Sequence, residues 1–101
     1  MSIGRQMPRY RSHKEVSALK IKDVVCHAHE DSAVSIDEFA KTDEFQGGHI
    51  FPADPRYGLI PFDAEFYRKH RPVAGGYYVV YEDGYKSFSP AKAFEEGYTP
   101  I

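Results

Sequence analysis

Alternating apolar and polar residues predict a pair of strands near the C-terminus. Residues 77–89 read Tyr-Tyr-Val-Val-Tyr, Glu-Asp-Gly and Tyr-Lys-Ser-Phe-Ser. An Asp-Gly pair favours a two-residue hairpin turn, because both positions of that turn need positive φ. The pattern therefore predicts a hairpin that turns at Asp83 and Gly84 and places Val79 opposite Phe88.

The two faces of this hairpin differ in polarity. The more apolar face should pack on the core; it holds Tyr77, Val79, Tyr81 and Phe88. On the other face, Tyr78 and Tyr85 are candidates for an exposed aromatic surface.

Residues 15–25 predict another strand. Val16 and Ala18 share one phase of the alternation, whereas Leu19 and Ile21 share the other. One extra residue in a strand reverses its faces, so the phase change predicts a bulge or twist near residue 18. A short helix is the alternative, but the valines and isoleucine favour a strand.

Two short helices carry start signals. Ser35 and Glu38 fit a capping box, in which the Ser hydroxyl accepts from the amide three residues on; this helix should end near Lys41. Asp63 is placed to cap a helix over residues 64–70, which has acidic residues first and basic residues last, as the helix dipole favours.

A third helix should follow the hairpin. Ser89 is the expected cap, and Pro90 suits the first helical position, where no amide is needed. Gly97 should end the helix in the left-handed conformation. Phe94 would then pack back on the hairpin.

These elements predict an α+β fold. A small, mostly antiparallel sheet should form from strand 15–25 and hairpin 77–89, with two or three short helices against it. Residues 1–14 should be an extended basic arm and residues 15–101 a single small domain. The expected core holds Leu19, Ile21, Phe66, Val79, Phe88 and Phe94.

The middle of the chain predicts a loop-rich insert at about residues 26–62. Glycine and proline are frequent in residues 46–61, and long loops in small domains often carry function. His49–Phe51 and Tyr57–Ile60 are short apolar islands, and each is able to add an edge strand.

The charge balance argues against a generic polyanion binder, because 15 acidic residues exceed 13 basic ones and the net charge is -2. The distribution is uneven, with a basic stretch over residues 1–22 and an acidic one over residues 23–45. A basic arm suits contact with nucleic acid or with an acidic patch on a neighbouring subunit.

The sequence predicts no catalytic, metal or cofactor site. Cys26 is the only cysteine, which excludes an intrachain disulfide. Cys26, His27 and His29 are metal-ligand types, but they are spaced too closely to form one zinc site easily. Adjacent strand residues point to opposite faces, so Cys26 and His27 should not form a catalytic pair. We therefore expect a protein that is not an enzyme.

Two segments resemble a family of small proteins from tailed bacteriophages and prophages. Tyr10–Ile21 is similar to the opening strand of that family, and Pro72–Tyr98 is similar to its closing signature of a glycine, a hairpin, Ser-Pro and Phe-Glu-x-Gly-Tyr. The resemblance implies a virion-associated protein, such as a capsid decoration, head-stabilising or minor capsid protein. A phage-encoded binder or inhibitor of a host or defence protein is the alternative, and a nucleic-acid-contacting accessory protein is the third.

The expected partners are a phage capsid protein, further copies of the chain in a homo-oligomer, or both; nucleic acid is not favoured. The residues expected to contact a partner are Arg5, Arg9, Tyr10, Arg11, Tyr78 and Tyr85. No apolar run approaches the ~18 residues that span a bilayer, and residues 1–15 lack the apolar region of a signal peptide. We expect the protein in the host cytoplasm when it is made and in the virion if its role is structural.

Overall fold

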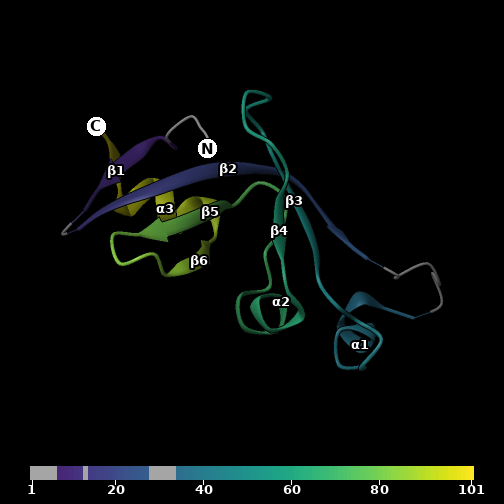
Figure 1. Ribbon diagram of the computed structural model, residues 1–101. Helices are drawn as coiled ribbons and strands as arrows, with labels where there is room; N and C mark the ends of the chain where they lie inside the picture. The colour runs from purple at the N-terminus through teal and green to yellow at the C-terminus, as the bar shows by residue number, and fades with distance from the viewer. Residues whose placement is uncertain (1–6, 13, 28–33) are drawn as a thin grey trace.

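The computed structural model describes residues 7–12, 14–27 and 34–101 and has the predicted α+β fold (Figure 1). Within them, seven strands form one antiparallel sheet, and three short helices pack against it. The strands are β1 (Arg9–Arg11), β2 (Glu15–Cys26), β3 (Gly48–Pro52), β4 (Ile60–Phe62), β5 (Tyr77–Tyr81), β6 (Lys86–Ser89) and β7 (Thr99–Pro100). The helices are α1 (Ile36–Phe39), α2 (Ala64–His70) and α3 (Ala91–Gly97).

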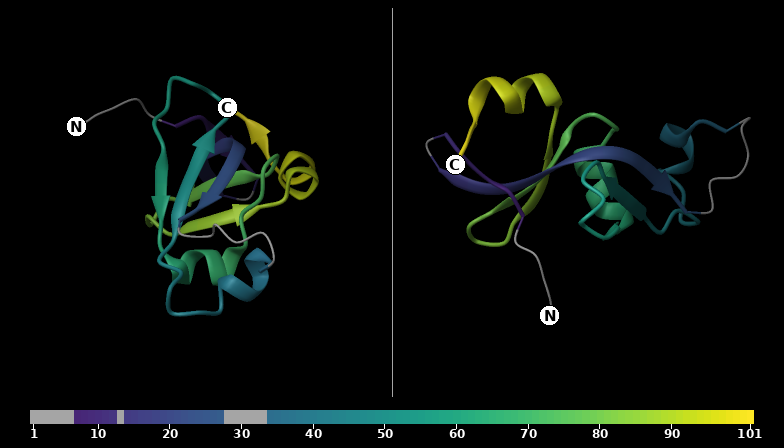
Figure 2. Two further views of the ribbon diagram at one scale, coloured as in Figure 1. Left: turned by 90° about the vertical axis from the view of Figure 1, so that its right-hand side faces the viewer. Right: turned by 90° about the horizontal axis from the view of Figure 1, so that it is seen from above.

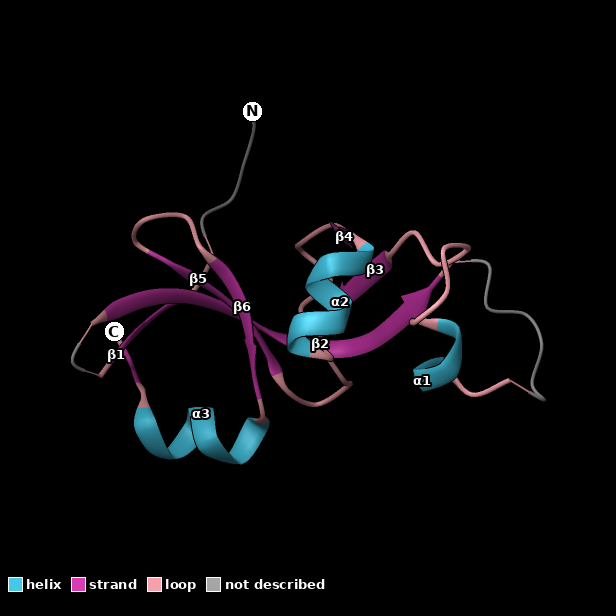
Figure 3. Ribbon diagram, turned by 90° about the horizontal axis from the view of Figure 1, so that it is seen from below, coloured by secondary structure: helices cyan, strands magenta, loops and turns pink. Residues whose placement is uncertain are grey.

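The long strand β2 organises the sheet. On one of its edges β1 pairs with the first half and β3 with the second half, while β5 pairs with the first half on the opposite edge. β6 extends the sheet beyond β5, β7 extends it beyond β1, and β4 extends it beyond β3. Figures 1 and 3 show β2 running through the molecule, with α3 near one end and α1 near the other.

Both faces of the first half of β2 are buried, which explains the change of phase in its sequence. Val16 and Ala18 pack with Phe94 of α3 on one face. Leu19 and Ile21 point to the other face, where Ile21 packs beside Tyr78. Figure 2 shows α3 on one side of the β2 ribbon and α2 on the other.

The register irregularity of β2 lies farther along the strand than predicted. Pairing with β5 is continuous from Val16 to Lys20, so the bulge or twist expected near residue 18 is not there. The register shifts instead between Ile21 and Asp23, where β3 is the partner. The irregularity therefore lies where pairing with β5 on one edge of β2 ends and pairing with β3 on the opposite edge begins.

The β5–β6 hairpin has a three-residue loop, so the predicted two-residue turn is wrong. The backbone amide of Tyr81 donates to Tyr85 O, and Glu82, Asp83 and Gly84 form the loop between them. Gly84 has φ +89°, and it is the only loop residue with positive φ. A turn followed by a glycine in this conformation is a common three-residue hairpin, and it accepts Asp-Gly as readily as the shorter turn.

This difference shifts the pairing by one residue and moves Phe88 to the opposite face. Phe88 lies opposite Tyr78, not opposite Val79. Tyr78 is therefore buried, with 5% of its surface exposed, and the prediction that it belongs to an exposed aromatic surface is wrong. Tyr85 retains 44% exposure, as expected of a surface ring.

The start signals of α1 and α2 are confirmed. Ser35 Oγ accepts from the Glu38 amide at 3.2 Å, and an Asp63 carboxylate oxygen accepts from the Phe66 amide at 2.8 Å. Arg68 on α2 donates to the carbonyls of Ala40 and Thr42, which fastens the segment after α1 to α2.

The ends of α3 differ from the prediction. Pro90 occupies the cap position and Ser89 is the last residue of β6, so the Ser hydroxyl does not cap the helix. Gly97 remains helical and is not left-handed. The helix ends because Tyr98 is extended, while its amide still donates to Phe94 O at 2.9 Å.

The predicted core is largely confirmed. Leu19, Ile21, Val79 and Phe94 are buried, whereas Phe66 and Phe88 are partly buried against Ile21 and Tyr78. A third cluster that was not predicted joins the middle of the chain to α2; it holds Ala40, Phe45 and Tyr67.

The middle segment contributes two strands. His49–Phe51 lies within β3, and Ile60 at the end of the second apolar island begins β4. The two strands pair with each other, and β3 also pairs with β2. Part of the predicted insert is therefore a continuation of the sheet.

Candidate interaction surface

Three of the residues expected to contact a partner lie on the surface near one end of the sheet. Arg9 and Arg11 are on β1, and Tyr85 follows the β5–β6 loop. Tyr10, between the two arginines, is instead half-buried against the rings of Phe94 and Tyr77. Its role in the structure is packing.

The remaining two expected contact residues are Tyr78 and Arg5. Tyr78 belongs to the core, as described above, and Arg5 lies outside the described residues. Among the expected contact residues that the structure describes, those at the surface are Arg9, Arg11 and Tyr85.

An open groove of about 810 Å³ lies between the start of β2 and the β5–β6 loop. We call it the Arg11–Tyr85 groove; it is lined by Arg11, Lys14, Glu15, Tyr81, Glu82, Asp83 and Tyr85. A smaller hollow of about 340 Å³ shares Glu15, Tyr81 and Glu82 with it and extends it toward Arg9. The groove therefore collects residues from β1, β2 and the β5–β6 hairpin.

Opposite charges alternate around this groove. Glu15 accepts from Arg9 through one carboxylate oxygen and from Arg11 through the other, each at 3.0 Å. Glu82 and Asp83 line the same groove from the hairpin loop. The arginines thus face carboxylates, and no extended basic surface results here.

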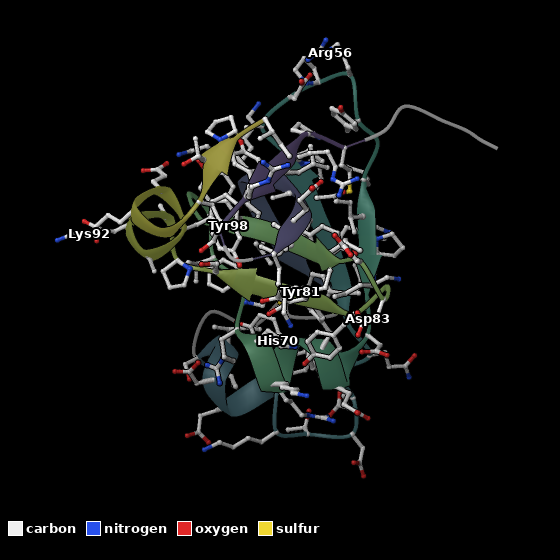
Figure 4. All side chains as sticks on the ribbon, turned by 90° about the vertical axis from the view of Figure 1, so that its left-hand side faces the viewer. Arg56, His70, Tyr81, Asp83, Lys92 and Tyr98 are labelled. Atoms are coloured by element: carbon white, nitrogen blue, oxygen red, sulfur yellow. The ribbon has the colours of Figure 1, made fainter. Side chains whose placement is uncertain are left out.

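The aromatic part of the groove is held by α2. The rings of Tyr81 and Tyr85 lie 6.0 Å apart, and a hydrogen bond of 3.2 Å joins Tyr85 Oη to His70 Nε2. Lys69 Nζ lies 5.2 Å from the centre of the Tyr85 ring, within the range of a cation–π contact. Figure 4 shows Tyr81, Asp83 and His70 gathered on one side of the molecule, with Arg56 and Lys92 at its margins.

Two titratable groups of α2 respond to this arrangement. Partial burial lowers the pKa of His70, and the positive charge of Lys69 acts in the same direction. The hydrogen bond between Lys69 and Tyr85 raises the pKa of the Lys69 ammonium. Near neutral pH, Lys69 therefore supplies the positive charge beside Tyr85, and His70 is biased toward its neutral form.

Cys26 and His27 have different surroundings, as expected for neighbours on a strand. Cys26 packs at the cluster that contains Tyr67, and burial raises the pKa of its thiol. His27 is exposed and contacts His49. Over the described parts of the chain, no three histidine, cysteine or acidic side chains gather as a metal site.

Sequence reasoning found the arginines and Tyr85 but missed their partners in the groove. The sequence pattern places Lys14 in the basic arm, Glu15, Tyr81 and Glu82 in strands, and Asp83 in the hairpin turn. A signal was available for Glu82 and Asp83, since charged residues in a hairpin loop must lie at the surface. The closeness of that loop to β1 depends on β2, which pairs with both β1 and β5.

Comparison with models of protein families, with curated proteins and with solved structures produced no match for this chain. In the described ranges, no helix has the length and apolar character needed to cross a bilayer.

Proposed function

We propose that this chain is a non-catalytic protein-binding protein of bacteriophage origin, with a virion-associated structural role as a capsid decoration, head-stabilising or minor capsid protein. The observation that carries the binding role is the Arg11–Tyr85 groove, where exposed aromatic area lies beside charges of both signs. Tyrosine and arginine are enriched at the centres of protein interfaces. The phage origin rests on the resemblance of the opening strand and the closing hairpin–helix segment.

A protein partner suits the groove better than nucleic acid does. Binding to nucleic acid depends on cations that can neutralise phosphates. Here Glu15 already pairs with Arg9 and Arg11, and Glu82 and Asp83 would repel a phosphate backbone. A partner that presents both signs of charge and an apolar contact for Tyr85 would complement the groove.

The backbone around the groove favours a preformed binding surface. β2 lies between β1 and β5 in the sheet, and a hydrogen bond to His70 holds the Tyr85 hydroxyl. A surface that needs little ordering on binding loses less conformational entropy. We expect the same surface in the free and the bound protein.

The virion role is tested by quantitative mass spectrometry of purified particles from the encoding phage or prophage. We expect the chain at a copy number that is a fixed ratio to the major capsid protein, as symmetric assembly requires. Tyr85→Ala should deplete it from particles, because a central interface tyrosine is typically worth about 2 kcal/mol or more, roughly 30-fold in affinity. Lys92→Ala, on the exposed side of α3, is the matched control and should leave incorporation unchanged.

Absence of the wild-type chain from particles would refute the virion role while leaving the binding role open. The chain should then be captured with one host or defence protein when it is expressed alone, and Tyr85→Ala should abolish that capture. If wild type and Tyr85→Ala behave alike in both assays, the groove is not the binding surface.

A further inference from the structure

Two histidines that are far apart in the sequence meet on the outer face of the second half of the sheet. Nε2 of His27 lies 2.7 Å from Nδ1 of His49, and the two ring centres are 4.6 Å apart. His27 follows β2, whereas His49 is in β3. Neither ring belongs to the Arg11–Tyr85 groove.

We propose that His27 and His49 form a binding site for a divalent transition-metal ion of the Zn²⁺ and Cu²⁺ class, independent of the partner-binding groove. Imidazole nitrogen is a preferred ligand for these ions, and it binds them at about 2.0–2.1 Å. At that bond length, two nitrogens on one ion lie about 2.9 Å apart at a right angle and about 3.4 Å apart at the tetrahedral angle. The observed separation of 2.7 Å is within a few tenths of an ångström of the first arrangement.

The two rings now share a hydrogen bond, in which one nitrogen donates and the other accepts. An ion would replace the shared proton, and each nitrogen would direct a lone pair at the metal. Small rotations of both side chains satisfy this change, because His27 is exposed and His49 is half-exposed. Two protein ligands leave the other coordination positions to water or to a further ligand.

The backbone beneath the two rings is fixed by close packing. Val25 pairs with His49 across the strands, and the amide of His27 donates to Gly47 O at 2.9 Å. A Cβ on Gly48 would lie only 2.0 Å from Val25 O, so glycine permits the close approach of β3 to β2 here. The spacing of the two histidines is therefore set by strand pairing at His49 and by the backbone hydrogen bond to Gly47 O at His27.

The surroundings admit an ion from solvent. Val25 is 42% exposed and Phe51 is 36% exposed on this part of the surface. α3 covers the other end of the sheet, where it packs on Val16 and Ala18. The described residues consequently leave the pair open to solvent.

The test is calorimetric titration of the full chain with ZnCl₂ and, separately, with CuCl₂ in a buffer that does not bind metals. We expect one ion per chain, tighter binding of Cu²⁺ than of Zn²⁺ in keeping with the usual affinity order, and no competition from Mg²⁺. His27→Gln and His49→Gln should each weaken binding by at least roughly 10- to 100-fold. That is the usual cost of removing a residue that only supports a metal ligand, and here the ligand itself is removed. His70→Gln, which removes a histidine bonded to Tyr85, is the matched control and should bind as wild type does.

The imidazole NMR signals provide a readout that does not depend on heat. Zn²⁺ should shift the signals of His27 and His49 together and leave that of His70 in place. Undiminished binding in both His27→Gln and His49→Gln would overturn the proposal, and so would a wild-type titration without binding. Circular dichroism of each variant must match wild type, so that lost binding is not lost folding.

Discussion

Removing the Phe94 ring should cost a large part of the stability of this protein. Phe94 is 1% exposed and is the only buried residue that α3 contributes to the core. Its ring stacks on Tyr77 at 4.3 Å and on Tyr98 at 4.6 Å, and it meets Tyr10 edge-on at 4.8 Å. Phe94 is therefore the buried side chain through which α3 packs on the sheet, and its ring also contacts Tyr10 of β1.

The expected cost of Phe94→Ala is about 4–5 kcal/mol. Truncation of a buried phenylalanine to alanine typically costs about 3–5 kcal/mol, from lost burial and from the cavity that remains. Three ring contacts place this site in the upper part of that range, because each aromatic pair contributes about 0.5–1.5 kcal/mol beyond its burial. Domains of this size are stable by only about 5–15 kcal/mol in total.

Urea denaturation followed by circular dichroism measures the difference. Phe94→Leu keeps most of the apolar volume but loses the stacking, so it should cost about 1–2 kcal/mol. Lys92→Ala, in the same helix but facing solvent, should change stability by less than about 0.5 kcal/mol. A loss below about 2 kcal/mol for Phe94→Ala, or equal losses for Phe94→Ala and Phe94→Leu, would refute the packing described for α3.

Two further substitutions, at Gly48 and at Tyr77, test single close contacts. Gly48→Ala should destabilise by about 1–3 kcal/mol, because its Cβ would meet Val25 O at 2.0 Å, whereas Gly58→Ala, with no atom within 4 Å, should be nearly neutral by the same urea assay. Burial, together with the hydrogen bond to Glu95, raises the pKa of Tyr77 to about 12. The neutral phenol should thus contribute its full stabilisation below pH 10, the ordinary pKa of tyrosine. As the pH rises toward 12, the free energy of unfolding should lose up to about 3 kcal/mol of this contribution. Tyr77→Phe should lack this part of the alkaline decline in unfolding free energy, and an unchanged decline would contradict it.

The parts of the fold that were predictable depend on neighbours in the sequence. The caps at Ser35 and Asp63 are bonds between a side chain and an amide three residues on, so a short motif contains all the information. The hairpin was predictable for the same reason, but its register was not. Two- and three-residue loops both accept Asp83-Gly84, and packing of Tyr78 and Phe88 on the second face decides between them.

The candidate site was less predictable, because its residues meet through β2. Arg11 and Tyr85 lie 74 positions apart along the chain (85 minus 11), and no local pattern connects them. The same is true of His27 and His49. The sequence groups His27 with Cys26 as metal-ligand types, whereas strand pairing separates these two and brings His49 to His27 instead.

The two proposed sites lie at opposite ends of one strand, which makes them separable by experiment. Glu15, in the groove, begins β2, and His27 follows its last residue. Twelve steps along a strand span at most about 40 Å, close to the longest dimension of the molecule, 43 Å. Substitutions so far apart usually have independent effects. Tyr85→Ala should leave metal binding intact, and His49→Gln should leave particle incorporation intact. If His49→Gln also removed the chain from particles, the ion would belong to the assembly interface, and the two sites would act together through a partner that spans the sheet.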